Sequence, residues 1–200
     1  MSQSTSPDAR SWWLALEPQW QEAFNEGFFG KARTTEMPGE AELQNLLHSP
    51  AIRLIGPKGP YPNLSFELTN LSGVKQLSRL ETLVVGFCQL SSLEPLAGLH
   101  KLKALFLFGN ALESLDGIQP LKNMEQLYAN LNRISDIKPI KSLTNLREFY
   151  CNYNQLQSLE GLTKAHRKSM KKFVCLPNEE LPDSEILKVE RQLLIRCQQG

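Results

Sequence analysis

A unit of 22 residues occurs four times in succession, without a gap, between residues 80 and 167. The copies begin at Leu80, Leu102, Met124 and Leu146. The fourth and sixth positions are apolar in every copy, and the eleventh, fourteenth, seventeenth and twentieth are Leu or Ile except at Ala165. One such unit cannot bury its apolar side alone, so neighbouring copies must stack. The repeat therefore predicts a solenoid.

The spacing within the unit predicts a strand followed by a return path. Positions four and six lie two residues apart, as on the buried side of a strand, whereas the later apolar positions lie about three apart. Position sixteen reads Pro95, Gly117, Pro139 and Gly161, which interrupt long helices. We therefore expect strands that pair in parallel on one side, and extended chain or short 3₁₀ turns on the convex side.

Position nine predicts a ladder of amide side chains. After Cys88 in the first copy it is always Asn, and a degenerate unit that follows the fourth copy continues the series. An Asn amide at the end of a strand can bond backbone groups of the turn that would otherwise be buried without a partner. The expected structural ladder consists of Asn110, Asn132, Asn154 and Asn178.

The pattern LxxLxLxxNxLxxLxxLxxLxx resembles that of leucine-rich repeat proteins. Its length is similar to the 22-residue class found in internalin-like proteins and in a regulatory subunit of type-one protein phosphatases. The resemblance implies an α/β repeat fold, a short right-handed solenoid with a parallel concave sheet, over residues 58–181 when degenerate units on both sides of 80–167 are included. It also implies protein or peptide recognition, without naming a ligand.

A solenoid needs atypical caps at its ends, and residues 1–57 are expected to form a helical cap and a junction. Ser6 and Pro7 are expected to begin a helix, Pro18 to kink it or begin a second one, and a further helix is expected over about 39–48. The apolar side chains at helical spacing in the first segment are Trp13, Leu16, Trp20 and Phe24. We expect them in the core, with a docking surface as the alternative.

Residues 182–200 are expected to form a C-terminal capping helix. Asp183 or Ser184 is the expected N-cap. The apolar residues expected to close the last layer are Ile186, Val189, Leu193 and Leu194.

The composition excludes several classes of partner and site. The formal net charge is +1, so neither nucleic acid nor an anionic membrane is expected as a partner. The four cysteines show no CxxC spacing, which argues against zinc sites and disulfide scaffolds. With no leader-like N-terminus and no long apolar run, we expect a cytoplasmic protein with reduced thiols, although leaderless secretion stays open.

No catalytic residue, metal or cofactor is expected. Gly-rich phosphate loops, HExxH and GxSxG are all absent from the sequence. The alternative is a Cys-dependent enzyme that uses Cys151 with His100 or His166, but Cys151 and Cys175 occupy inward positions where buried, inert thiols are expected. A basic cluster is expected to be a solvated face; it consists of Lys164, His166, Arg167, Lys168, Lys171 and Lys172.

The concave surface is the expected binding site. With positions four and six inward, positions three, five and seven point outward. The residues expected to bind a partner there, or just past the strands, are Val84, Phe87, Phe106, Phe108, Gln126, Tyr128, Asn130, Glu148, Tyr150, Asn152 and Tyr153. We expect a non-enzymatic protein- or peptide-binding module, a scaffold or regulatory adaptor. The alternatives are that stacked rings only stiffen the sheet, that a terminal segment covers the face, or that the protein self-associates.

Overall fold

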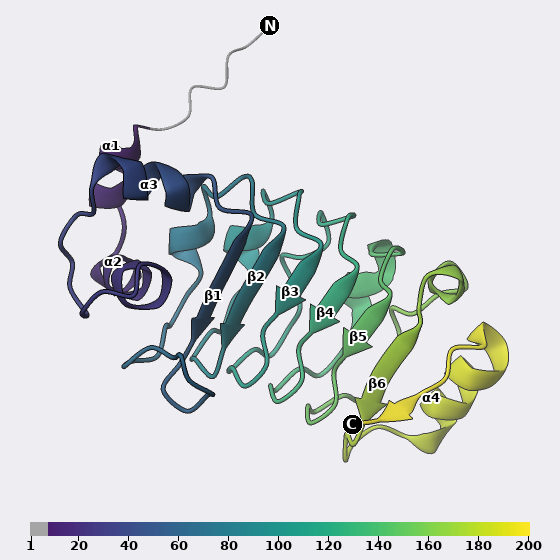
Figure 1. Ribbon diagram of the computed structural model, residues 1–200. Helices are drawn as coiled ribbons and strands as arrows, with labels where there is room; N and C mark the ends of the chain where they lie inside the picture. Colours follow the sequence, from purple (N-terminus) through teal and green to yellow (C-terminus); the bar gives the residue numbers. More distant parts are fainter. Residues whose placement is uncertain (1–7) are drawn as a thin grey trace, which may run out of the picture.

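The computed structural model describes residues 8–200, in which seven parallel strands form one sheet in the order of the sequence (Figure 1). Helices lie at both ends of the row of strands. The strands are β1 (Ala51–Ile55), β2 (Thr82–Gly86), β3 (Ala104–Phe106), β4 (Gln126–Tyr128), β5 (Glu148–Tyr150), β6 (Lys172–Leu176) and β7 (Gln198–Gln199). The parallel-sheet solenoid expected from the repeat is confirmed.

The strands pair in the register that the 22-residue spacing requires. Leu83, Leu105, Leu127 and Phe149 are paired in turn across β2 to β5, and all four are fully buried. The apolar residues of the return paths are buried against them in one continuous core. Burial of this core is the main driving force for the fold.

The convex side consists of turns and short 3₁₀ helices, as expected. The 3₁₀ helices are Ser72–Val74, Glu94–Leu96, Lys138–Ser142 and His166–Lys168. Gly117 and Gly161 have φ of 105° and 128°. A Cβ at Gly161 would lie 2.2 Å from the carbonyl oxygen of Ile137, so a side chain at this position would clash with the preceding repeat.

The Asn side chains form hydrogen bonds that join successive repeats. Asn132 Nδ2 donates to the carbonyl oxygens of Leu107 and Ala129, at 2.9 and 3.1 Å, and its Oδ1 accepts from the Leu112 amide at 3.1 Å. Asn110, Asn154 and Asn178 bond equivalent groups. These are the hydrogen bonds that the sequence pattern predicts. Each side chain satisfies donors and acceptors in two repeats, so it holds the turn and fixes the stacking together.

The N-terminal cap contains α1 (Ala9–Leu14), α2 (Pro18–Ala23), a π-helical turn (Phe24–Phe28) and α3 (Glu40–Leu47). The expected start at Ser6 and Pro7 lies outside the described residues, and Asp8 caps α1. Pro18 begins α2, where its fixed φ suits the first turn. Trp13, Trp20 and Phe24 are fully buried. These aromatic residues therefore pack in the core, and Leu16 packs against it while partly buried.

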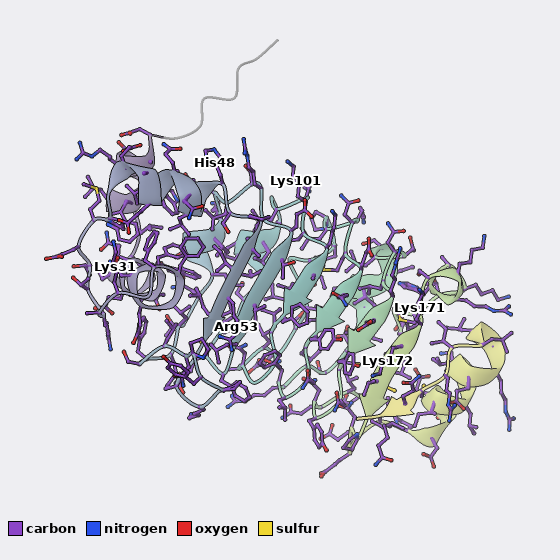
Figure 2. The ribbon with its side chains drawn as sticks, viewed as in Figure 1. Lys31, His48, Arg53, Lys101, Lys171 and Lys172 are labelled. Atoms are coloured by element: carbon purple, nitrogen blue, oxygen red, sulfur yellow. The ribbon has the colours of Figure 1, made fainter. Side chains whose placement is uncertain are left out.

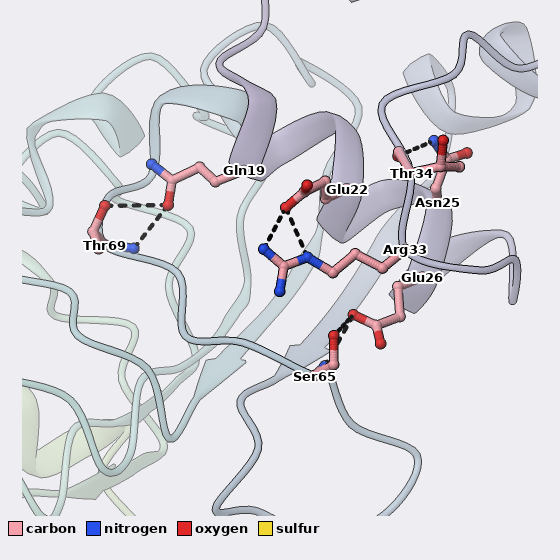
Figure 3. A network of polar contacts seen from close by, with 8 residues as sticks. All are labelled: Gln19, Glu22, Asn25, Glu26, Arg33, Thr34, Ser65 and Thr69. Carbon is pink, nitrogen blue, oxygen red and sulfur yellow. Dashed lines mark hydrogen bonds and ion pairs between the residues drawn. The ribbon is translucent and has the colours of Figure 1, made fainter.

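Polar contacts attach this cap to the first degenerate repeat (Figure 3). Gln19 Oε1 accepts hydrogen bonds from the backbone amide and hydroxyl of Thr69, both at 3.1 Å. Glu26 Oε2 accepts from the amide and hydroxyl of Ser65 in the same way. The cap thus supplies side-chain acceptors to backbone amides that have no preceding repeat beside them.

The sheet begins earlier than the sequence analysis expected. Residues 51–55 fall in the segment assigned to the helical cap and junction, yet they form β1 and pair with β2 over five residues. Ile52 and Leu54 are buried, whereas Ala51 and Arg53 are exposed. This alternation is the sequence signal for β1, but it stands outside the 22-residue repeat and was missed.

The C-terminal helix is shorter than expected. Helix α4 (Asp183–Lys188) begins after Pro182 and continues into a π-helical turn (Val189–Leu193). Leu194 then takes a left-handed conformation with φ of 55° and ends the helix. The following residues return to the sheet as β7, beside β6. The expectation of one helix from residue 182 to 200 is therefore wrong for the last residues.

His166 is buried and does not belong to a basic surface. The backbone amide of Thr163 donates to its Nδ1 at 3.1 Å, so Nε2 carries the hydrogen and donates to the carbonyl oxygen of Ile140 at 3.1 Å. Burial lowers the pKa of His166 below its usual value. Its expected place in the basic cluster was wrong, because its ring fills the convex layer.

We predict that Asn132→Leu lowers the free energy of unfolding by about 1–3 kcal/mol, because backbone groups of the turn lose their buried partners. Urea denaturation measures the change. The matched control is Asn130→Leu, which changes the same residue type on the half-exposed concave side. Equal midpoints for the two variants would contradict a structural role for the ladder.

We predict that the free energy of unfolding decreases as the pH falls below about 6.5. In this range the His166 side chain binds a proton in the unfolded protein, whereas in the folded protein its lowered pKa keeps it neutral. In His166→Gln the decrease in unfolding free energy between pH 7.5 and 5.5 should be smaller than in the wild type. His100→Gln, at an exposed position, is the control for replacing a histidine. The same decrease in all three proteins would show that His166 makes no contribution.

Candidate functional site

The outward side chains of the strands form a concave surface that is partly open to solvent. On β2 to β5 the fifth position of each repeat is half-exposed, and so is the seventh position in the second and third copies. The expected binding residues that are half-exposed or exposed are Val84, Phe87, Phe106, Phe108, Gln126, Tyr128, Asn130, Glu148, Tyr150 and Tyr153. The structure brings these residues onto one face and its adjoining edge.

Three aromatic rings stack across the centre of this face. Phe106 and Tyr128 have ring centroids 4.6 Å apart, and Tyr128 and Tyr150 have centroids 4.2 Å apart with planes inclined by 18°. Paired strands lie about 4.8 Å apart, so in-register rings meet face to face. We call Phe106, Tyr128 and Tyr150 the aromatic ladder. The flat surfaces of the middle ring are covered by its neighbours.

The last ring of the ladder is covered by a cation. Lys172 Nζ lies 5.1 Å from the centroid of the Tyr150 ring, in the range of a cation–π interaction. Figure 2 shows Lys172 on β6 and Arg53 on β1, toward opposite ends of the same face. The aromatic ladder therefore lies between two exposed positive charges.

A hydrogen bond fixes the polar edge of the middle ring. The hydroxyl of Tyr128 donates to a carboxylate oxygen of Glu148 on the next strand. Burial is the larger cause that raises the pKa of Tyr128 above its usual value, and the hydrogen bond to the Glu148 carboxylate raises it further. The hydroxyl therefore stays protonated at neutral pH, and it holds Glu148 in place on the face.

Large apolar side chains occupy strained backbone positions at the end of the strands. Phe87, Leu131 and Tyr153 have φ of 52°, 58° and 54°, and the same position of the second copy is Gly109. A left-handed conformation costs about 1–2 kcal/mol for a residue with a Cβ. Leu131 and Tyr153 are 44% and 50% exposed. Glycine is the residue that this turn favours, so the fold does not require these apolar groups.

Phe87 and Tyr153 were expected at this surface from the sequence, whereas Leu131 was not. Position eight of the repeat reads Phe, Gly, Leu and Tyr, which has no consistent polarity. The glycine in one copy is the only signal that the position takes positive φ. We call Phe87, Leu131 and Tyr153 the left-handed edge residues; they border the concave face.

The C-terminal residues cover one end of the concave face. Asn152 is 5% exposed, and a Cβ at Gly200 would lie 2.5 Å from its Nδ2. Asn152 is therefore not accessible to a partner while the C-terminal residues occupy this place. Within the described residues 8–200, the C-terminal segment covers the end of the face near β6 and leaves the fifth-position side chains of β2 to β5 half-exposed.

Two further hollows lie beside the concave face. One is lined by charged and polar groups at the amino ends of the strands, including Lys103, Arg147, Lys168 and Lys171. The other lies where the cap meets β1 and is lined by residues that include Phe28, Phe29, Arg53, Ile55 and Tyr61. The basic cluster expected from the sequence is thus divided, since Lys168 and Lys171 line the first hollow and Lys172 lies on the concave face.

The thiols at inward positions are buried, and burial raises the pKa of Cys151 well above its usual value. His100 is exposed, and His166 forms hydrogen bonds with Thr163 and Ile140.

Within residues 8–200 there is no group of three or more His, Cys, Asp or Glu side chains that could hold a metal ion. No helix in the same residues is both long enough and apolar enough to cross a membrane.

Comparisons with known proteins agree with this architecture. The family described as Leucine Rich repeats (2 copies) matches residues 122–164. A comparison with curated protein sequences gives no match.

Two solved structures share the fold. An internalin from Listeria monocytogenes is 22% identical over 58% of this chain and 38% of its own, with a TM-score of 0.52. An LRR protein from Leptospira interrogans is 24% identical over 86% of this chain and 41% of its own, with a TM-score of 0.57. The chain thus spans about two fifths of the length of each.

We predict that Leu131→Asn and Tyr153→Asn change the free energy of unfolding by less than about 1 kcal/mol, because Asn tolerates positive φ and both side chains are exposed. Thermal and urea denaturation measure this. Leu127→Asn, at a fully buried position, is the contrasting control and should cost several times more. A large loss in the first two variants would mean that these side chains are needed for stability.

Proposed function

Because the chain folds as a leucine-rich-repeat solenoid, we propose that it is a non-enzymatic protein- or peptide-binding module that acts as a scaffold or regulatory adaptor. Its binding site in this proposal is the concave face, from β2 to β5, together with the left-handed edge residues. The partner is a polypeptide, and neither nucleic acid, a membrane nor a cofactor is part of the proposal.

The aromatic ladder is the observation that carries this proposal. The inward positions already supply a continuous core, and Phe106, Tyr128 and Tyr150 point away from it. Half-exposed aromatic side chains with a polar border are typical of recognition surfaces, where Tyr is enriched among residues that dominate binding energy. The left-handed edge residues extend this apolar surface beyond the strands.

The orientation of the rings favours a polypeptide over sugars or bases. Sugars and nucleobases bind aromatic residues through the flat surface of the ring. In the ladder both flat surfaces of Tyr128 and Tyr150, and one flat surface of Phe106, are covered by neighbouring rings or by Lys172. The two tyrosine rings therefore present their edges to a partner. The C–H groups of these edges carry partial positive charge and suit carbonyl oxygens and the faces of a partner's aromatic side chains.

The polar side chains that border the aromatic ladder supply hydrogen-bonding groups for the backbone of a bound partner. Gln126 and Asn130 are half-exposed on either side of Tyr128. An amide both donates and accepts, so it can pair with the N–H and C=O groups of an extended segment. The positive charges of Arg53 and Lys172 lie toward the two ends of the face.

The state of the buried thiols supports a non-enzymatic role. Cys151 has no histidine among its hydrogen-bonding partners, and burial holds its pKa well above neutral, so it lacks the means to become a nucleophile. Cysteines 88, 151, 175 and 197 are all free thiols in the structure. Because thiols stay reduced in the cytosol, the presence of four free thiols supports a cytoplasmic location, which is part of the proposal.

We predict that Phe106→Ser, Tyr128→Ser and Tyr150→Ser together abolish capture of the partner from a native lysate, because they remove the apolar centre of the face. Circular dichroism and thermal melting should stay close to those of the wild type, since none of the three side chains is buried in the core. Quantitative mass spectrometry of the captured proteins measures the loss.

The control variant carries Lys75→Ser, Lys122→Ser and Lys141→Ser, three exposed positions away from the concave rows, and should capture the same proteins as the wild type. If a folded triple aromatic variant still captures them, the concave face is not the binding site. The hollow between the cap and β1 would then be the next candidate.

A further inference from the structure

Three thiols gather at the C-terminal end of the solenoid. Cys175 lies on β6 and is buried, and Cys197 comes directly before β7, the strand that pairs with β6. The pairing of β7 with β6 brings Cys197 beside Cys175, where each thiol shifts the pKa of the other, and Cys151 lies near both. Cys175 and Cys197 are 22 residues apart, which is the length of one repeat, so stacking places them in neighbouring layers.

Cys197 begins a short segment that folds back onto the sheet. We call residues 197–200 the C-terminal strap. Its amide at Cys197 donates to Glu190 Oε1 at 3.1 Å, and the amide of Gly200 donates to the carbonyl oxygen of Leu176 at 2.9 Å. Between these bonds, β7 pairs with β6 through an irregular register. The strap is thus held to the last full strand by few interactions.

The strap covers part of the concave face. Gly200 lies against Asn152 and Val174, since a Cβ there would be 2.5 Å from Asn152 Nδ2 and 2.8 Å from Val174 Cγ1. Val174 occupies the outward fifth position of its repeat, yet it is 1% exposed. Asn152 Oδ1 is buried and has no hydrogen-bond partner. Removal of the strap would uncover both side chains and lengthen the open face by one strand.

Cys197 has the character of an attacking thiol and Cys175 that of its resolving partner. Cys197 is partly exposed, and the hydrogen bond from Cys175 lowers its pKa, because that bond stabilises the thiolate. The same interaction is the larger cause that raises the pKa of Cys175, and burial raises it further. A partly exposed thiol of low pKa beside a second thiol is the arrangement found at redox-sensitive cysteines.

We propose that Cys175 and Cys197 are a site of reversible disulfide formation, with hydrogen peroxide as the oxidant, and that the disulfide locks the C-terminal strap over the end of the concave face. The proposal rests on the contact between the two thiols and on the placement of the strap. It does not depend on which partner binds the face.

The chemistry requires one peroxide per disulfide. The Cys197 thiolate attacks one peroxide oxygen; an S–O bond forms as the O–O bond breaks, and the departing hydroxide takes up a proton to become water. The Cys175 sulfur then attacks the Cys197 sulfur, the S–S bond forms, and the sulfenic hydroxyl leaves as a second water with the proton of Cys175. Two thiols lose two electrons, which the peroxide gains. A thiol reductant reverses the reaction by exchange.

The test treats the whole folded protein with equimolar hydrogen peroxide and measures its mass. We expect a loss of two hydrogens and, after digestion with trypsin under non-reducing conditions, a disulfide between the peptides 173–188 and 197–200. The oxidised protein should also melt at a higher temperature than the reduced one, and dithiothreitol should remove both changes. Peptide 197–200 should exchange its amide hydrogens more slowly once oxidised.

Cys197→Ser should abolish the loss of mass and the shift in melting temperature, whereas Cys88→Ser, at a buried cysteine far from this end, should preserve both. An unchanged mass, added oxygen without a disulfide, a link from 197–200 to the peptide that contains Cys151, or a link between two molecules would each overturn the proposal. A disulfide that leaves the exchange of the strap unchanged would overturn the locking role.

Discussion

The stacking of apolar layers at a fixed interval of 22 residues is the constraint on which the rest of the structure depends. No unit buries its own leucines, so each layer is stable only when another layer covers it. The register from Leu83 to Phe149 follows from this requirement, as does the need for a helical cap that places Trp13, Trp20 and Phe24 over the first layer. The Asn ladder then provides buried partners for the turns.

The same stacking determines the chemistry of the concave face. Side chains at one repeat position are held one strand apart, so aromatic residues at position five must stack with ring centroids 4.2–4.6 Å apart. The flat surfaces of Tyr128 and Tyr150 are then covered, and the edges of these rings remain for a partner. A solenoid with aromatic residues in one row therefore presents a surface suited to polypeptide groups, and the left-handed edge residues add apolar side chains at a cost in backbone strain.

The sequence allowed the prediction of the features for which the residue type itself repeats. Positions four, six and nine recur, so the buried residues, the outward row and the roles of Asn110, Asn132, Asn154 and Asn178 follow from one unit. Features that occur once, or whose residue type differs between copies, were missed or misplaced. Strand β1 lies outside the repeat period, and the residues that share the left-handed conformation of Leu131 are dissimilar. The C-terminal helix ends at Leu194, a non-glycine residue with positive φ, for which the sequence carries no glycine signal.

The central claim is that a polypeptide partner contacts the edges of the aromatic ladder. Its most direct test places the photoreactive residue benzoylphenylalanine at position 128, or at the exposed position 141 on the convex side, and irradiates each protein with the captured partner. Covalent attachment of the partner from position 128 and not from position 141 is the predicted result. Attachment from position 141 alone, or from neither position while capture persists, would contradict the account.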